Sequence, residues 1–238
     1  MRNLFFIALY LLVVCSSCGS TESDSGKALY NYYLPFDLLV QSDLIMEYRY
    51  VGTEDAPFYW YYHMKSKNDE QVLFTGEQLD AYGEILVETE ELLVENGILL
   101  KSQQITERDT STDERVATRF DIMSDDLFLF KDLTTESKVK SKITFNSNVY
   151  KGQKTTIDKE RQYLGDTSII YEGVSFPAKR FLIHEHYDIE EIGHLEFDLR
   201  GEEVYAEGLG LVYVRKLSDD GQAIEYYLHK YEIVDDES

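Results

Sequence analysis

Apolar and polar residues alternate in short runs along most of the chain, from about Leu34 onwards. In the stretch LIMEYRYV, every second residue from Leu44 to Tyr50 is apolar or aromatic, whereas Glu47 and Arg49 fall on the opposite face. This period of two is typical of a strand with one buried face. We therefore predict a chain that is built mainly from strands.

The same pattern returns at intervals, separated by turn residues. Asn96-Gly97 stands between two apolar runs, and Asn-Gly is the strongest short signal for a β-hairpin. The segment from Ser218 to Gly221 has the composition of a turn between the last two predicted strands. Further strands are predicted over residues 117–123, 127–131, 139–145, 168–171, 180–187, 194–200, 211–217 and 224–234.

The first residues have a different pattern. Arg2 precedes an uninterrupted apolar run from Leu4 to Val14, which is shorter than the roughly 20 residues that a membrane-spanning helix needs. Such a run is typical of a secretory signal peptide, which we predict over residues 1–17. Small residues then lead into Cys18, and this arrangement resembles the lipobox of bacterial lipoproteins, in which the cysteine is acylated and becomes the mature N-terminus. An ordinary signal peptide with incidental cysteines is the alternative.

Residues 18–28 are mostly small and polar, so we expect a flexible tether between the lipid and the domain. The acyl chains on Cys18 would hold the protein at a membrane. We therefore expect an exported protein, lipid-anchored to the outer membrane and facing the periplasm or the cell surface. The formal net charge of −22 repels phosphate backbones, which argues against a nucleic-acid partner. The partners that we expect are the membrane, a lipid or other apolar ligand, and an envelope protein.

Strands that follow one another through short turns predict an antiparallel meander. The expected fold class is all-β and mainly antiparallel, either a single large curved sheet or a half-open β-barrel, with few or no helices beyond the signal peptide. Residues 76–86 could hold one short helix. The 19 Tyr and 12 Phe, against 3 Pro, agree with this interpretation because aromatic side chains favour pleated surfaces. No shift in composition marks a second domain, so residues 29–238 should form one antiparallel β domain.

Two short motifs stand in the second half of the chain. The stretch VSFPAKRF covers residues 174–181, and YAEGLGLVYV covers residues 205–214. The second is not a dinucleotide-binding loop, because the position of the third glycine holds a tyrosine and a strand pattern follows. Pro177 cannot donate to a strand ladder and suits an edge or a bend, whereas Gly208 and Gly210 permit backbone angles that other residues avoid. Fold geometry therefore explains these motifs without any ligand.

The two motifs also resemble a pair found in exported bacterial lipoproteins, V-x-V-P-A-G-x-F followed by Y-A-P-G-V-G-L-V. The earlier stretch YLPFDLLVQSDLIMEYRY is similar to the start of the same chains, Y-x-P-L-x-x-G-x-x-W-x-Y. On these residues the chain resembles the LolA/LolB and LppX-like half-barrel lipoproteins. The resemblance implies a half-barrel that holds acyl chains between a curved sheet and a helical lid.

The stretch FYWYYHMK is aromatic on both faces. Tyr59, Tyr61 and His63 alternate away from the face that Phe58 and Trp60 share. One of the two faces should therefore line a second core layer or a concave cavity. A strand buried on both sides is one interpretation. The other is a wall that faces a lipid, a glycan or another apolar solute, with Tyr59, Tyr61 and His63 as its candidate ligand-binding residues.

The densest group of titratable residues is FLIHEHYDIEEIGHLEFDLR. If its two strands form a hairpin, His184, His186 and His194 all lie on the face opposite the apolar side chains. Two imidazoles two residues apart, with a third across a hairpin, could bind zinc or copper. The alternative is the polar outer face that any half-exposed hairpin carries.

Signatures of catalysis are missing from the sequence. There is no G-x-S-x-G elbow, and both cysteines lie at the signal peptide, so the mature domain has no thiol nucleophile. We expect no enzymatic activity and no cofactor. The expected function is the binding of an apolar or amphipathic ligand, and the alternative is a protein-interaction or scaffolding module of the outer membrane or cell surface. An enclosed cavity lined by Tyr59, Tyr61 or their neighbours would favour the first, and a filled core with an exposed apolar patch would favour the second.

Overall fold

A computed structural model describes residues 25–67, 71–129, 133–191 and 193–234. These residues contain two short helices, α1 (Ser25–Tyr33) and α2 (Phe36–Leu39), and thirteen strands. The strands are β1 (Asp43–Tyr50), β2 (Phe58–Lys67), β3 (Val72–Leu79), β4 (Ile85–Val94), β5 (Gly97–Arg108), β6 (Arg115–Arg119), β7 (Asp121–Leu129), β8 (Lys138–Asn146), β9 (Lys154–Tyr171), β10 (Val174–Glu190), β11 (His194–Ala206), β12 (Gly210–Ser218) and β13 (Ala223–Val234).

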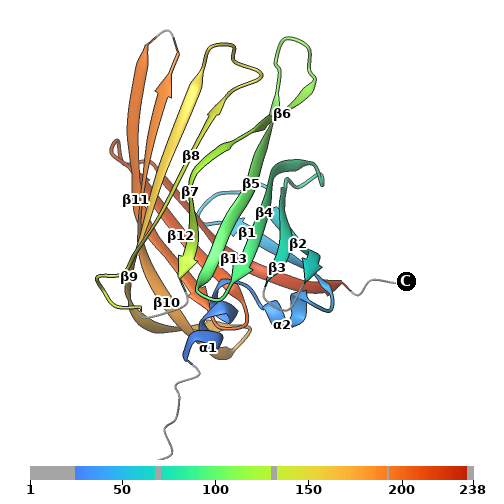
Figure 1. The fold of residues 1–238 in the computed structure, drawn as a ribbon, viewed down its shortest axis with the longest axis vertical. Helices are drawn as coiled ribbons and strands as arrows, with labels where there is room; N and C mark the ends of the chain where they lie inside the picture. The colour runs from blue at the N-terminus through green and yellow to red at the C-terminus, as the bar shows by residue number, and fades with distance from the viewer. Residues whose placement is uncertain (1–24, 68–70, 130–132, 192, 235–238) are drawn as a thin grey trace, which may run out of the picture.

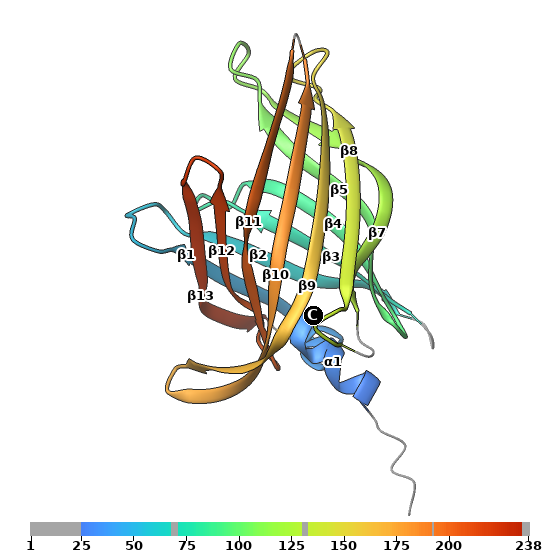
Figure 2. The same cartoon turned by 90° about the vertical axis from the view of Figure 1, so that its left-hand side faces the viewer.

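Twelve of the thirteen strands close into an antiparallel barrel (Figures 1 and 2). Neighbours in the ring follow the order of the chain, except that β13 returns to pair with β1 and β5 pairs with β7 as well as β4. The short strand β6 pairs with the second half of β5, along the edge that β7 also takes, and leads directly into β7. The expected all-β, mainly antiparallel fold is confirmed, and the ring is closed where a half-open barrel would leave an edge.

The β4–β5 hairpin supplies the point of closure. Val94 pairs with Gly97 across a two-residue turn at Glu95-Asn96, which confirms the predicted hairpin, and Gly97 itself is the first residue of β5. Gly97 also pairs with Leu129 of β7, and a Cβ atom on Gly97 would lie only 2.1 Å from the carbonyl oxygen of Phe128. Only glycine allows this close approach of two backbones. The missing side chain therefore lets β7 reach β5 and complete the ring.

The two helices cover one end of the barrel, the lower end in Figure 1, and the chain runs from them directly into β1. Pro35 stands at the N-terminal end of α2, where its missing N–H costs no hydrogen bond. Leu34, Phe36 and Leu39 are between 1% and 3% exposed and join the main core cluster of the barrel. This short segment, residues 34–39, therefore acts as an apolar plug, and we call it the plug below.

The N-terminal predictions meet the structure only in part. Helix α1 begins at Ser25, inside the stretch predicted as a tether over residues 18–28. The signal peptide predicted over residues 1–17 and the lipidation predicted at Cys18 lie outside the described residues. Neither helix in the described part of the chain has the length and apolar character that crossing a bilayer requires.

Most predicted strands match observed ones, with two local corrections. The strand predicted over residues 117–123 is interrupted, because β6 ends at Arg119 and the amide of Phe120 donates to the carbonyl of Gln103 at 2.9 Å. The helix considered for residues 76–86 is wrong, since residues 76–79 belong to β3. A Cβ atom on Gly76 would lie 2.7 Å from the ring of Tyr62, so the glycine serves close side-chain packing inside the barrel.

Candidate binding cavity

A cavity of about 410 Å³ lies inside the barrel, a volume within the range of small-molecule sites. One side of it is aromatic. The indole of Trp60 and the ring of Tyr62 stack at 5.6 Å with an angle of 12° between them, and both line the cavity from β2. Tyr48 from β1 and Tyr226 from β13 continue this wall. Packed rings of this kind offer a large apolar surface to a ligand.

Only one of the two aromatic faces of β2 lines the cavity. Trp60 and Tyr62 line it, whereas Tyr59, Tyr61 and His63 alternate with them along the strand and therefore point to the outer side. The hydroxyl of Tyr61 donates to Asp43 at the start of β1. The cavity is thus lined by the neighbours of the predicted ligand-binding residues and not by those residues themselves.

Opposite the aromatic wall, five charged side chains meet on the inner face of β9 to β12. We call Lys159, Arg161, Glu185, Glu203 and Lys216 the charged belt. Their bonds form one connected network, with Lys159 Nζ at 3.0 Å from Glu185 and 2.7 Å from Glu203, Arg161 Nε at 2.6 Å from Glu203, and Lys216 Nζ at 2.9 and 2.8 Å from the two oxygens of Glu185. All five residues line the cavity.

Two tyrosines complete the bonding of the belt. Tyr187 donates its hydroxyl to Glu185 at 3.2 Å, and Tyr205 donates to Glu203 at 2.9 Å. Arg161 also donates to the carbonyl oxygen of Leu127 at 2.9 Å. Buried charges are tolerated only when they are paired and hydrogen-bonded in this way.

The belt holds both carboxylates in the ionised form. Burial opposes ionisation of Glu185, but Lys159 and Lys216 outweigh this cost and lower its pKa to about 2. Burial likewise opposes ionisation of Glu203, and the charges of Arg161 and Lys159 still hold its pKa far below the ordinary value. Both carboxylates of this wall are therefore ionised at physiological pH, whereas burial and the charge of Lys159 lower the pKa of Lys216.

A further carboxyl group, Glu91, has a different environment. It is 4% exposed, and it accepts hydrogen bonds from the hydroxyl of Tyr33 at 2.8 Å and from that of Thr89 at 3.1 Å. Burial raises the pKa of Glu91, and these two hydrogen bonds and the charge of Arg161 only partly offset it. Glu91 thus joins the N-terminal segment to the cavity wall through hydrogen bonds from two hydroxyl groups, and burial raises its pKa.

The alternation rule did not reveal the belt, because the inward positions of β9 are charged. Lys159 and Arg161 stand where a half-buried strand would carry apolar residues, so the first half of β9 was absent from the predicted strands. A signal was present in β10. Glu185 lies between Ile183 and Tyr187 on the apolar face of the strand, opposite His184 and His186. A carboxylate at an inward position of a strand predicts a buried cationic partner.

The two motifs of the second half meet at the floor of the cavity. Ala178 pairs with Ala206, and the amide of Glu207 donates to the carbonyl of Pro177 at 2.9 Å. The amide of Gly208 donates to the carbonyl of Asn31 in α1 at 2.8 Å.

Gly210 lies against the same helix. It has φ +77°, and a Cβ atom there would lie 2.8 Å from the carbonyl oxygen of Tyr33. The motif residues Pro177, Gly208 and Gly210 therefore lie where the β11–β12 turn contacts α1. This contact closes the lower end of the barrel.

The three histidines all lie on the outer face of the β10–β11 hairpin, where they form two separate groups. His184 and His186 both contact the same oxygen of Asp198, at 2.9 and 3.1 Å. His194 lies beyond them, at 2.5 Å from Asp188 and 3.5 Å from Glu196.

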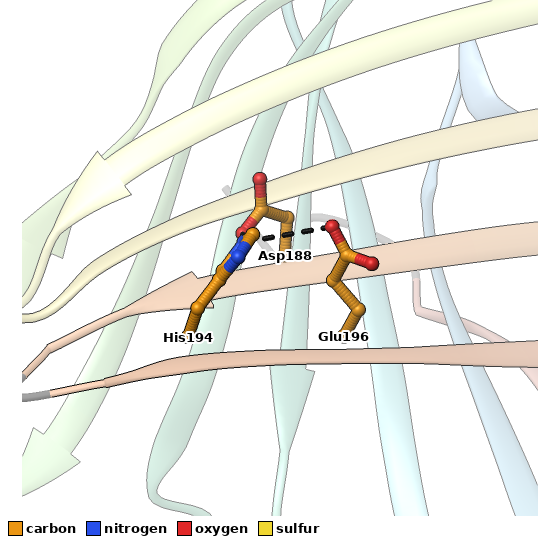
Figure 3. Close-up of side chains that lie close together, drawn as sticks. All are labelled: Asp188, His194 and Glu196. Atoms are coloured by element: carbon orange, nitrogen blue, oxygen red, sulfur yellow. Dashed lines mark hydrogen bonds and ion pairs between the residues drawn. The ribbon is translucent and has the colours of Figure 1, made fainter.

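Figure 3 shows the side chains of Asp188, His194 and Glu196 converging from the two strands. Their candidate ligand atoms lie within 4.8 Å of one another, the only such group found in the described residues. One imidazole and two carboxylates could hold a zinc-like ion. Asp188 already accepts a hydrogen bond from His194 and raises the pKa of that imidazole. A metal ion bound here would have to replace the proton of this hydrogen bond. The structure thus brings His194 together with two carboxylates and leaves His184 and His186 outside the group.

Comparison with known proteins adds information on the fold. No protein-family model matches the sequence, and no curated protein is significantly similar to it. Among solved structures, a candidate lipoprotein from Parabacteroides distasonis ATCC 8503 matches with TM-score 0.54 and 11% identity, over 84% of this chain and 98% of that one. A candidate exported protein with a YmcC-like fold from Bacteroides fragilis NCTC 9343 matches with TM-score 0.54 and 12% identity, over 81% of this chain and 96% of that one. At such low identity these likenesses concern the fold alone, and this chain shares the overall fold of both proteins.

Proposed function

We propose that this chain is a non-enzymatic, lipid-anchored envelope protein that binds an apolar or amphipathic ligand inside its barrel. The observation that carries the proposal is the cavity of about 410 Å³, with an aromatic wall on one side and the charged belt on the other. A core whose only role was stability would be filled to native density and would avoid buried charges. An open, two-sided interior is instead what a ligand with an apolar part requires.

The proposed location draws on the N-terminal sequence and on the structural neighbours. The apolar run and Cys18 have the pattern of a lipoprotein signal, and the two matching structures are described as a lipoprotein and an exported protein. The resemblance to LolA/LolB and LppX-like half-barrels adds a candidate role for the N-terminal helices. In those chains a helical lid covers the ligand, and here α1 and the plug would cover the lower end of the cavity.

The chain contains its own reporter of binding. Trp60 is the single tryptophan of the sequence and it lines the cavity, so a ligand that enters will change the indole emission. Native mass spectrometry of the protein purified from cells should show a co-purifying lipid-like molecule. Stripping that molecule and adding it back should shift the Trp60 emission reversibly. A protein that is ligand-free in every preparation and whose emission responds to no amphipath would contradict the proposal.

A matched pair of variants separates binding in the cavity from binding elsewhere. Ile157→Phe adds volume to a side chain that lines the cavity, and it should weaken binding. Leu182→Phe adds the same ring to an outward position of β10 that is 45% exposed, and it should leave binding unchanged. Equal effects of the two variants would show that the ligand does not occupy the barrel.

The alternative of a protein-interaction or scaffolding module gains less support from the surface. Two strongly exposed apolar side chains lie in the β9–β10 hairpin, Ile170 at 79% and Val174 at 57%. Val174 pairs with Tyr171 and therefore shares its face, whereas Ile170 is on the opposite face. The two side chains do not form one continuous patch, so we place this alternative second.

A further inference from the structure

The charged belt does not balance its own charge. Lys159, Arg161 and Lys216 bring three cations to the inner wall, whereas Glu185 and Glu203 bring two carboxylates. The belt therefore carries one positive charge in excess, inside a protein whose formal net charge is −22. The neighbouring carboxyl of Glu91 stands outside this network, because its hydrogen bonds come from the hydroxyls of Tyr33 and Thr89, and burial raises its pKa.

The cations, and not the carboxylates, face the cavity. The side chains of Lys159 and Lys216 are each 18% exposed, whereas those of Glu185 and Glu203 are 4% and 3% exposed. Because all four line the cavity, the residual exposure is largely exposure to its interior. A molecule that enters meets the two ammonium groups first, with the carboxylates behind them. Each ammonium group keeps one donor beyond its two contacts with carboxylate oxygens, since it has three.

The apolar surface lies across the barrel from these cations. In the ring of twelve strands, β2 and β9 are six strands apart in either direction, so Trp60 and Tyr62 stand opposite Lys159. This separation suits a molecule with one charged end and one apolar end. The volume of about 410 Å³ lies near the lower end of the range for small-molecule sites, which favours a single chain over a lipid with several.

We propose that the cavity binds a single-chain amphipath with a monoanionic head group, with the head at Lys159 and Lys216 and the chain along the wall formed by Trp60 and Tyr62. This inference rests on the proposed function and names its ligand class. One negative charge neutralises the excess of the belt, and each oxygen of the head accepts a charge-assisted hydrogen bond from an ammonium group.

Three probes with the same chain test the head group: dodecanoate, dodecanol and dodecyltrimethylammonium, each titrated below its micelle concentration with Trp60 emission and calorimetry as readouts. We expect dodecanoate to bind at least about tenfold more tightly than dodecanol, and the cation to bind most weakly. Equal binding of dodecanoate and dodecanol, or tighter binding of the cation, would overturn this inference while the proposed function stands. If none of the three binds, the proposed function fails as well.

Two variants that break the same ion pair provide the control for folding. Lys216→Met removes one cation and brings the charge of the belt to zero, whereas Glu185→Gln removes one carboxylate and raises the excess to two. The ratio of dodecanoate affinity to dodecanol affinity should fall about tenfold in the first variant and be kept or raised in the second. Dodecanol binding monitors the integrity of the cavity in both. A fall of the ratio in both variants, or in neither, would overturn the inference.

Discussion

Lys216 of β12 donates to both carboxylate oxygens of Glu185 of β10, at 2.9 and 2.8 Å, although β11 lies between the two strands. The residue of β11 that pairs with Lys216 is Gly201. A Cβ atom on Gly201 would lie 1.7 Å from the carbonyl oxygen of Arg215, so β12 can approach β11 this closely only at a glycine. A backbone feature thus brings together the two ends of a buried ion pair.

Loss of Lys216 should therefore destabilise the fold. Lys216→Met keeps the length of the apolar stem but leaves Glu185 with one cation in place of two, and we expect a loss of about 3 kcal/mol in the free energy of unfolding. Urea denaturation at neutral pH measures it. Lys230→Met is the control, because Lys230 is exposed on β13 and contacts Glu232 of the same strand, and it should leave the stability unchanged. A Lys216→Met protein as stable as this control would contradict the role of the belt.

Acid should weaken the protein through the same carboxylates. The pKa of Glu185 is about 2 in the folded state against 4.5 in an unfolded chain, so its contribution of about 3 kcal/mol is fully present above pH 4.5. It is lost progressively as the pH falls from about 4.5 towards 2, because the unfolded state then binds the proton first. Unfolding curves between pH 2 and 7 for the wild type and for Glu185→Gln should converge in this window. A constant difference between the two proteins would contradict the assignment.

Glu91 should have the opposite pH dependence. Its pKa is raised by burial, so the folded state holds a proton that the unfolded state releases above pH 4.5, and stability is lost as the pH rises through this interval. Glu91→Gln keeps the acceptor for Tyr33 and cannot ionise. The stability of this variant relative to the wild type should increase from pH 4 to pH 8. A decrease over that range would show that Glu91 is ionised in the folded protein.

Closure of the ring should depend on Gly97. Gly97→Ala places a methyl group 2.1 Å from the carbonyl oxygen of Phe128, which must separate β5 from β7 at a cost of about 2–3 kcal/mol. Gly193→Ala is a suitable control, since nothing lies within 4 Å of a Cβ atom at that position and its backbone is not left-handed. Hydrogen exchange of the β7 amides should accelerate in Gly97→Ala alone. Equal protection in both variants would contradict the role given to this glycine.

The floor of the cavity can be tested with two neighbouring glycines. Gly208 and Gly210 both have left-handed backbones, so replacement by alanine costs about 1–2 kcal/mol at either position. Only at Gly210 does the new Cβ atom also meet the carbonyl oxygen of Tyr33, at 2.8 Å, whereas nothing lies within 4 Å at Gly208. Gly210→Ala should therefore detach α1 and speed proteolysis near it. If Gly208→Ala has the same effect, the contact with α1 is not the cause.

Local patterns predicted the parts of the fold in which one face of a strand is apolar. Leu44, Met46 and Tyr48 were placed on the buried face of β1, and each is 1% or 2% exposed. The β4–β5 hairpin was predicted from the dipeptide Asn96-Gly97, although the turn itself lies one residue earlier, at Glu95-Asn96. These features depend on neighbours within a few residues, and alternation and turn chemistry express that information directly.

The parts that escaped prediction depend on distant partners. Closure of the ring includes three residue pairs between β5 and β7, and no local sequence pattern in either strand indicates them. Lys159 and Arg161 are inward because Glu203 pairs with them 44 and 42 residues away, and a local pattern treats them as solvent-exposed. The cavity-lining face of β2 was ambiguous for a related reason. Both of its faces are aromatic, so only the position of the strand in the ring distinguishes Trp60 from Tyr59.

The pairing of β1 with β13 has a consequence for the order of folding. Asp43 pairs with Val234, so β1 obtains its second neighbour only after β13, the last of the described strands, has been synthesised. Until β13 has emerged, both β1 and β12 keep an edge of unpaired backbone groups, and such edges recruit other chains. Contacts between such distant segments also form slowly, because the entropy cost of closing the loop comes before any stabilisation from pairing. Biosynthesis therefore leaves this barrel with two open edges until β13 is available to pair with both strands.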